Sequence, residues 1–216
     1  MTQRSVHRFV PLLALSLVVA AGAATTAAAA APHHPERIEA ARHRPLGTTV
    51  TVRGTVTVPS DAFDPGFAVQ QGNAGIYVLD SLGTPRAIGD DVEITGTLVD
   101  SFGLLAIQPT SATTRGMHDP VDARHRKTGQ VGEHTEGQLL HLRGTMVGDL
   151  IDDSPFGFKL DIDDGSGPIQ IFLFPGTGIS TTGLVAGATI DTACFSNQFD
   201  TIFECDPPTA ADFSVE

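Results

Sequence analysis

Hydrophobic and polar residues alternate along this chain in short runs, a pattern that predicts β-strands with one face in a core. Over residues 49–56 the valines at positions 50, 52 and 56 point to one side, and threonine and arginine point to the other. Gly54 interrupts the run, and a glycine inside a strand often marks a bulge or a sharp bend. Segments rich in Gly, Asn and Asp follow, as expected for tight turns. The pattern predicts a chain made of short strands and turns.

The same series of runs occurs twice. Residues 52–56 (VRGTV) recur as 142–146 (LRGTM), with Gly144 in the place of Gly54. Later segments repeat in the same order: 66–69 as 157–160, 76–78 as 169–171, and 88–94 as 186–192. A kept order with spacing that changes only in loops indicates a duplicated domain. Because a long first strand bent at glycine lets a five-stranded sheet close on itself, we predict an all-β protein with two tandem five-stranded barrels of the OB type.

The repeat also sets the predicted domain limits. We expect a signal peptide at 1–31, an N-terminal segment with a short helix at 32–45, a first barrel at 46–112, a basic linker at 113–130 and a second barrel at 131–216.

The first 31 residues have the pattern of a secretory signal. Arg4 and Arg8 precede an apolar stretch, and a run of small residues follows, with cleavage expected after Ala29 or Ala31. The alternative, an uncleaved membrane anchor, is weaker because about 20 strongly apolar residues are needed to span a bilayer. We therefore expect a secreted or periplasmic protein whose mature chain has no transmembrane segment.

An exported chain with two cysteines usually pairs them. Under the repeat, Cys194 and Cys205 take the places of Gly96 and Ile107, which face each other on the hairpin of the fourth and fifth strands. Adjacent antiparallel strands can bring two cysteines within bonding distance. We predict a disulfide between Cys194 and Cys205.

The sequence of the second unit suggests a family. The segments GQVGE at 129–133, EGQLLHLRGT at 136–145 and DDGSGPIQIF at 163–172 resemble OB-fold domains of exported bacterial proteins, to which nucleic-acid binding is commonly attributed. The resemblance implies a fold with an outer sheet face that binds single-stranded nucleic acid, and it does not by itself establish a function.

Alternation of the strands predicts which side chains lie on that outer face. Aromatic rings would stack on bases or sugars, while cations and amides would bind backbone or base edges. The predicted ligand-binding residues are Arg53, Tyr77, Arg143, Lys159, Gln170, Phe172 and Phe174. Two alternatives stay open: Phe172 and Phe174 are covered by the other barrel or the linker, and Arg143 and Lys159 pair with Asp161 or Asp149.

The charge of the chain favours a second kind of partner. Lys and Arg number 13 against 25 Asp and Glu, a formal net charge of −12, and the cations gather in the linker rather than on the barrels. Single-strand binders usually have a positive groove. An extracellular glycan or protein is therefore the alternative partner, because an acidic surface tolerates neutral glycans and basic proteins.

Motifs for catalysis are missing from the sequence. It contains no Gly-x-Ser-x-Gly, no His-Glu-x-x-His and no Walker-type loop. The acidic segment 161–167 suits calcium in composition but lacks the full ligand spacing of an EF-hand, and His33, His34 and His43 are expected to be solvated tail residues. We expect no enzyme activity, no cofactor and no metal.

Overall fold

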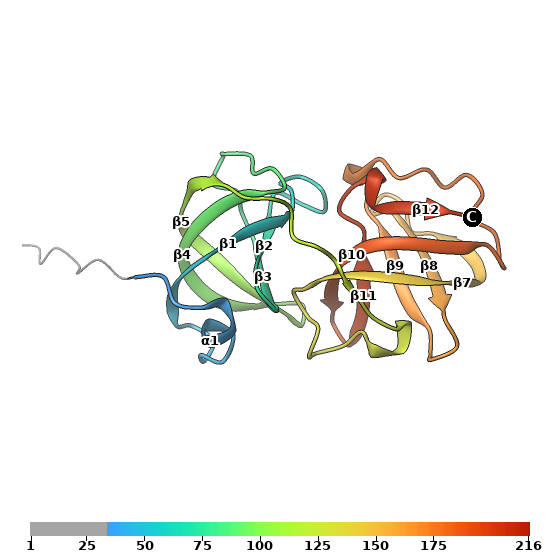
Figure 1. Cartoon of the computed structure of the whole chain (residues 1–216), viewed down its shortest axis with the longest axis horizontal. Helices are drawn as coiled ribbons and strands as arrows, with labels where there is room; N and C mark the ends of the chain where they lie inside the picture. Colours follow the sequence, from blue (N-terminus) through green and yellow to red (C-terminus); the bar gives the residue numbers. More distant parts are fainter. Residues whose placement is uncertain (1–33) are drawn as a thin grey trace, which may run out of the picture. The chain divides into compact units, whose positions relative to one another are not determined.

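The computed structural model describes residues 34–216 (Figure 1). The predicted signal peptide lies outside the described residues. A short helix, α1 (Ile38–Arg42), precedes the first strand, as the sequence predicted. Within residues 34–216 no helix is long and apolar enough to cross a membrane.

The first barrel contains five strands in the closed order β1-β2-β3-β5-β4. Their bounds are β1 (Thr49–Val58), β2 (Phe67–Gln71), β3 (Ala74–Val78), β4 (Asp90–Ser101) and β5 (Leu104–Met117). Neighbouring strands pair in antiparallel fashion, except that β3 and β5 pair in parallel. Figure 1 shows α1 at one end of this barrel, where Ile38 and Ala41 are fully buried among the core residues.

The second barrel repeats this connectivity. Its strands are β7 (Leu139–Asp152), β8 (Phe158–Asp163), β9 (Ile169–Leu173), β10 (Thr189–Phe199) and β11 (Ile202–Asp206). They pair in the ring β7-β8-β9-β11-β10, and β10 returns to β7. Two edge strands, β6 (Arg124–His125) and β12 (Phe213–Val215), extend the sheet. The predicted all-β fold with two tandem barrels is confirmed.

The two predicted bend glycines lie where the first strand of each barrel changes partners. β1 pairs with β4 as far as Thr55 and with β2 from Thr55 onward, so Gly54 directly precedes the change. β7 changes from β10 to β8 at Thr145, next to Gly144. A Cβ on Gly144 would lie 3.1 Å from the backbone of Asp163, which is tighter than ordinary packing. Glycine therefore allows the crowded corner that closes each ring.

The predicted disulfide is present. Cys194 on β10 and Cys205 on β11 are bonded, with their Cα atoms 5.3 Å apart, and both are fully buried in the second core. Disulfides are typical of oxidising compartments.

The connector between the two barrels begins later along the chain than the sequence suggested. β4 and β5 stay paired out to Asp90 and Met117, so the first barrel extends past residue 112. Arg124 and His125 then pair with Leu140 and His141 as β6, which places part of the expected connector in the second sheet. The alternation of hydrophobic and polar residues did not reveal the end of this strand, because residues 110–117 are largely exposed on both faces.

Candidate functional site: an aromatic groove on the second barrel

The predicted ring of Tyr77 is buried rather than displayed. Tyr77 is 4% exposed, its ring lies 5.8 Å from that of Phe195, and its hydroxyl donates a hydrogen bond to Asp64 Oδ1 at 2.5 Å. Burial and the neighbouring Asp64 carboxylate raise the pKa of Tyr77 far above its usual range, so the hydroxyl stays protonated. The expectation that Tyr77 lies on an open outer face is wrong, because the second barrel covers this part of β3.

The two predicted stacking residues Phe172, on β9, and Phe174, just after β9, lie next to the contact between the barrels. Phe174 lies 4.8 Å from Phe63 of the first barrel and 4.5 Å from Phe172, measured between ring centroids. Phe172 is 6% exposed. Contact with the other barrel, one of the two alternatives left open by the sequence, therefore holds for Phe174.

The predicted cations all have carboxylate partners. Arg53 binds Asp91 with its Nε 2.9 Å from both carboxylate oxygens, and this hydrogen bond lowers the pKa of Asp91 and raises that of Arg53. Arg143 Nη1 lies 2.9 Å from Glu216 Oε1. Lys159 Nζ lies 2.7 Å from Asp153 Oδ2. The partners of Arg143 and Lys159 differ from Asp161 and Asp149, which the sequence suggested.

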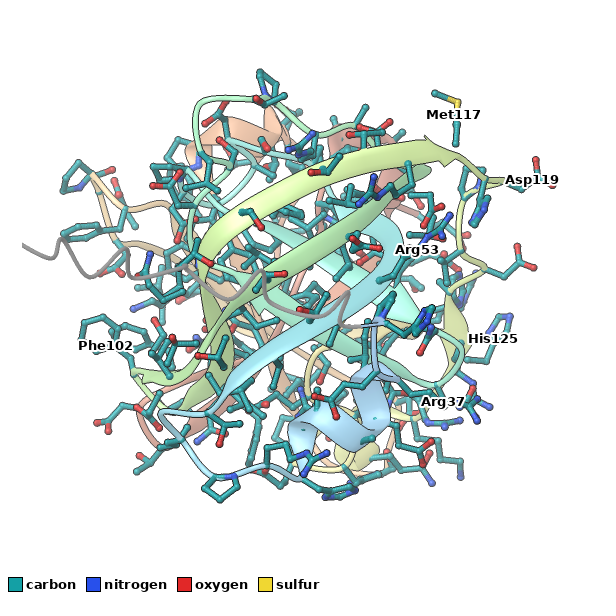
Figure 2. The ribbon with its side chains drawn as sticks, turned by 90° about the vertical axis from the view of Figure 1, so that its left-hand side faces the viewer. Arg37, Arg53, Phe102, Met117, Asp119 and His125 are labelled. Carbon is teal, nitrogen blue, oxygen red and sulfur yellow. A yellow bond between two sulfur atoms is a disulfide. The ribbon has the colours of Figure 1, made fainter. Side chains whose placement is uncertain are left out.

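These residues do not form one binding face. Arg53 pairs through β1 and β4 of the first barrel, whereas Lys159, Gln170 and Phe172 lie on β8 and β9 of the second. Figure 2 shows Arg53 well away from Phe102, which marks the tip of the β4–β5 hairpin. The structure brings together Lys159, Gln170, Phe172 and Phe174 and leaves Arg53 and Arg143 apart from them.

The four residues that come together line a groove of about 470 Å³, which we call the second-barrel groove. Its full lining is Asp153, Phe156, Lys159, Gln170, Phe172, Phe174, Phe199, Ile202 and Glu204. Phe156, Phe199 and Ile202 are 68%, 56% and 50% exposed. The Lys159 ammonium lies 5.5 Å from the centre of the Phe172 ring, a cation–π contact. A hollow that combines large apolar side chains with a few polar groups has the composition of a ligand pocket.

Glu204 also lines the groove, although it was not among the predicted site residues. It is 4% exposed, and its two carboxylate oxygens accept hydrogen bonds from Gln170 Nε2 at 2.7 Å and Asn197 Nδ2 at 3.2 Å. Burial raises the pKa of Glu204, while Gln170, Lys159 and Asn197 act in the opposite direction. The predicted closed barrel could have pointed to Glu204, because closing the ring pairs β11 with β9 in parallel and places Glu204 beside Gln170.

A second carboxyl group lies next to it. Asp206 is fully buried, and its Oδ2 accepts a hydrogen bond from Asn197 Nδ2 at 2.7 Å, whereas its Oδ1 has no partner in the described part of the chain. Burial and the neighbouring Glu204 raise the pKa of Asp206 well above its usual value. The two acids therefore hold protons at higher pH than ordinary carboxyl groups do.

The acidic turn at 161–167 uses its carboxylates internally. Asp163 Oδ1 accepts the backbone N–H groups of Gly165 and Gly167, and Asp164 Oδ1 accepts the hydroxyls of Ser166 and Thr128. Among residues 34–216 no group of three or more His, Cys, Asp or Glu is arranged to hold a metal ion.

Comparison with known proteins gives weak structural likenesses. No protein-family model matches the chain, and no curated protein matches it. The hypothetical protein YgiW from E. coli is 22% identical with a TM-score of 0.33, over 38% of this chain and 90% of that chain. A murine DNA-binding protein bound with double-stranded DNA is 11% identical with a TM-score of 0.37, over 76% and 94%. A replication protein A heterotrimer bound to single-stranded DNA is 10% identical with a TM-score of 0.33, over 78% and 49%. The strand connectivity of the chain itself, rather than any of these likenesses, defines its fold.

Proposed function

We propose that this protein is an exported, non-enzymatic binding module that holds a neutral polymeric ligand, an extracellular glycan, in the second-barrel groove. The observation that supports this most is the combination of exposed rings with a hydrogen-bonding floor. Phe156 and Phe199 offer apolar faces for sugar rings, and Gln170 and Glu204 add polar groups to the same lining. Ligand pockets typically combine an apolar lining with a few polar groups that fix orientation.

Charge supports a neutral ligand over a polyanion. The chain carries a formal net charge of −12, and the groove contains Asp153 and Glu204 against one cation, Lys159. Lys159 is already paired with Asp153. Binding to a phosphate backbone draws its free energy largely from cations that release counterions, and the groove offers few of them.

Single-stranded nucleic acid is the second candidate, and one observation favours it. The Lys159 ammonium beside the Phe172 ring is the arrangement of a cation next to a stacking platform that single-strand binders use. This candidate needs Lys159 to exchange Asp153 for a phosphate.

Export and the absence of catalysis are parts of the same proposal. The buried disulfide supports an oxidising compartment. Two observations support binding rather than catalysis. The side-chain amides of Gln170 and Asn197 already donate hydrogen bonds to the two carboxylate oxygens of Glu204. Asp206 is buried and does not line the groove, so it is not in a position to act on a ligand there.

The direct test is a titration of the protein with neutral cellohexaose, xylohexaose and fully N-acetylated chitohexaose, and separately with labelled oligothymidylate, at low and high salt. We expect saturable binding of at least one oligosaccharide that barely changes with salt. Oligonucleotide binding would instead weaken steeply as salt rises, and that result would replace the glycan with the second candidate.

Two variants locate the site. Phe156→Ala and Ile202→Ala remove exposed side chains of the groove, and each should weaken oligosaccharide binding several-fold without unfolding the protein. Phe102→Ala is the matched control, because Phe102 is 71% exposed but does not line the groove. Failure of every oligosaccharide and of the oligonucleotide to bind would overturn the proposal.

A further inference from the structure

A second hollow lies beside the second-barrel groove and has a different chemistry. It encloses about 240 Å³ between the two barrels, and we call it the interbarrel hollow. Its walls include six aromatic rings, those of Phe63, Tyr77, Phe102, Phe174, Phe195 and Phe199. The volume is below the roughly 300–1,000 Å³ of pockets for drug-sized ligands, so a small ligand or a single headgroup fits it best.

The rings are arranged around the hollow in contacting pairs. Phe63 lies 6.4 Å from Tyr77 and 4.8 Å from Phe174, while Phe102 and Phe199 stack at 5.5 Å. Phe63 and Tyr77 belong to the first barrel, and Phe174 belongs to the second. Phe102 lies at the tip of the β4–β5 hairpin and Phe199 at the tip of the β10–β11 hairpin. The Asp200 backbone N–H joins these tips by donating a hydrogen bond to the Phe102 carbonyl. The hollow is therefore a cage whose walls depend on the way the barrels pack.

Every charged group on its walls is negative. Asp64 and Glu204 line the hollow, and among the described residues that line it none is Lys or Arg. Gln198, whose side chain is an uncharged amide, also lines the hollow. Carboxylates and the negative faces of aromatic rings both attract a cation.

We propose that the interbarrel hollow binds a small organic cation, a quaternary or methylated ammonium group, which its rings surround and which Glu204 and Asp64 neutralise. Such a group loses little hydration on entering an aromatic cage, and cages of this kind are a recurrent means of recognising it. The proposal is independent of the glycan proposal, because the ligand and most of the lining differ.

Acidity should modulate this binding. Burial raises the pKa of Glu204, and the groups that face it are Lys159, Gln170, Asn197 and the neighbouring carboxyl of Asp206. A bound cation stabilises the ionised carboxylate, so binding should release protons and weaken as the pH falls through the pKa of Glu204.

The chain carries its own reporter for the experiment. It has one tyrosine and no tryptophan, so its ultraviolet fluorescence comes from Tyr77, which lies in the wall of the hollow. The protein is titrated with choline and, in parallel, with 3,3-dimethylbutan-1-ol, which has the same shape with a carbon atom in place of the charged nitrogen. Fluorescence and calorimetry follow both titrations.

We expect choline to give a saturable change at millimolar concentration or below and to bind about tenfold or more tightly than the neutral isostere. Glu204→Gln should remove most of that preference. Equal binding of the two ligands, or no saturable change with choline, would overturn the proposal.

Two exposed phenylalanines separate this site from the groove. Phe102 lines only the interbarrel hollow and Phe156 lines only the second-barrel groove, and they are 71% and 68% exposed. Phe102→Ala should weaken choline binding roughly three- to tenfold, and Phe156→Ala should leave it unchanged. If both variants bind choline as the wild type does, the cage is not its site and the inference fails, whatever the outcome with oligosaccharides.

Discussion

Gly75 on β3 and Gly137, which precedes β7, meet backbone to backbone where the two barrels pack together. A Cβ atom on Gly75 would overlap the carbonyl oxygen of Gly137, and a Cβ atom on Gly137 would overlap that of Gly75. Nearby, the Leu139 amide donates a hydrogen bond to Gln70 Oε1 at 2.8 Å, which also joins the barrels. Both positions therefore require glycine for reasons of space, and Gly137, with φ of +82°, also requires it for backbone conformation.

The first prediction concerns this contact. Gly75→Ala should lower the free energy of unfolding by about 1–3 kcal/mol or more, because the added methyl group meets rigid backbone and the barrels must separate to accept it. Gly116→Ala is the control, since a Cβ there has nothing within 4 Å. Denaturant unfolding monitored by circular dichroism measures both. Equal stability of the two variants would show that the barrels adjust freely.

More of the fold than of the candidate sites could be predicted from the sequence. The alternation of hydrophobic and polar residues, together with the repeat, predicted the positions of the strands. The repeat also predicted that Cys194 and Cys205 lie on adjacent strands. Alternation states which side of a strand a residue is on, but not what covers that side, so Tyr77 and Phe174 have the pattern of an outer face although the other barrel packs against them. Glu204 becomes buried only because ring closure places β11 beside β9. Both depend on long-range packing that no local pattern records.

The second prediction tests an ion pair that joins α1 to the second barrel. Arg42 Nη2 lies 2.7 Å from Glu136 Oε1, and the two side chains are 15% and 1% exposed. Burial raises the pKa of Glu136, and Arg42 opposes that shift. Arg42→Met should cost about 2–4 kcal/mol at pH 7.5, because it leaves a buried carboxylate without its cation.

The sign of the pH dependence follows from the raised pKa of Glu136. Below its ordinary value of 4.5 the group is protonated in both states, so the loss in Arg42→Met should be smallest there and should grow as the pH rises. Arg44→Met is the matched control: Arg44 is 58% exposed and 3.4 Å from Glu36, so its loss should be below about 1 kcal/mol. Unfolding at pH 4 and pH 7.5 distinguishes them.

The third prediction assigns Arg53 to stability rather than to ligand binding. Asp91 is 2% exposed and keeps a depressed pKa through its hydrogen bonds to Arg53. Arg53→Met should lower stability at neutral pH, because it leaves the buried Asp91 carboxylate without the cation that it binds. Because the pKa of Asp91 is lowered, this stabilisation is present above its ordinary value of 3.8 and disappears as the pH falls through the folded-state pKa. Oligonucleotide binding that weakens in a folded Arg53→Met protein would instead restore Arg53 to the ligand site.

The fourth prediction concerns the disulfide. Cys194 and Cys205 are 11 positions apart, and closing a loop of that length is worth about 2–3 kcal/mol on a chain-entropy model. The double variant Cys194→Ala with Cys205→Ala should lose at least that much stability, with a further cost for the methyl-sized space left in the core. A reducing agent should lower the unfolding midpoint of the wild type toward that of the variant. The variant itself should not respond to the reducing agent.

The fifth prediction follows from the buried carboxyl of Asp206. Its pKa is raised well above 3.8, first by burial and then by Glu204, so the folded state binds its proton more tightly than the unfolded state does. Stability from this group is therefore complete below pH 3.8 and is lost as the pH rises through the folded-state pKa. Asp206→Asn keeps an oxygen for the hydrogen bond from Asn197 and carries no charge at any pH. The variant should be more stable than the wild type at pH 8 by about 1 kcal/mol or more, with the difference shrinking toward pH 4.

Asp200→Asn provides the comparison for that change, because Asp200 lies exposed at the β10–β11 turn with φ of +58°, a conformation that asparagine also tolerates. It should leave the stability curve within about 0.5 kcal/mol of the wild type throughout. A wild-type curve that is flat between pH 4 and pH 8, or one that the Asp206→Asn change does not flatten, would mean that the carboxyl stays ionised in the folded protein. Such a result would contradict the raised pKa of Asp206, which burial and the neighbouring Glu204 carboxyl produce.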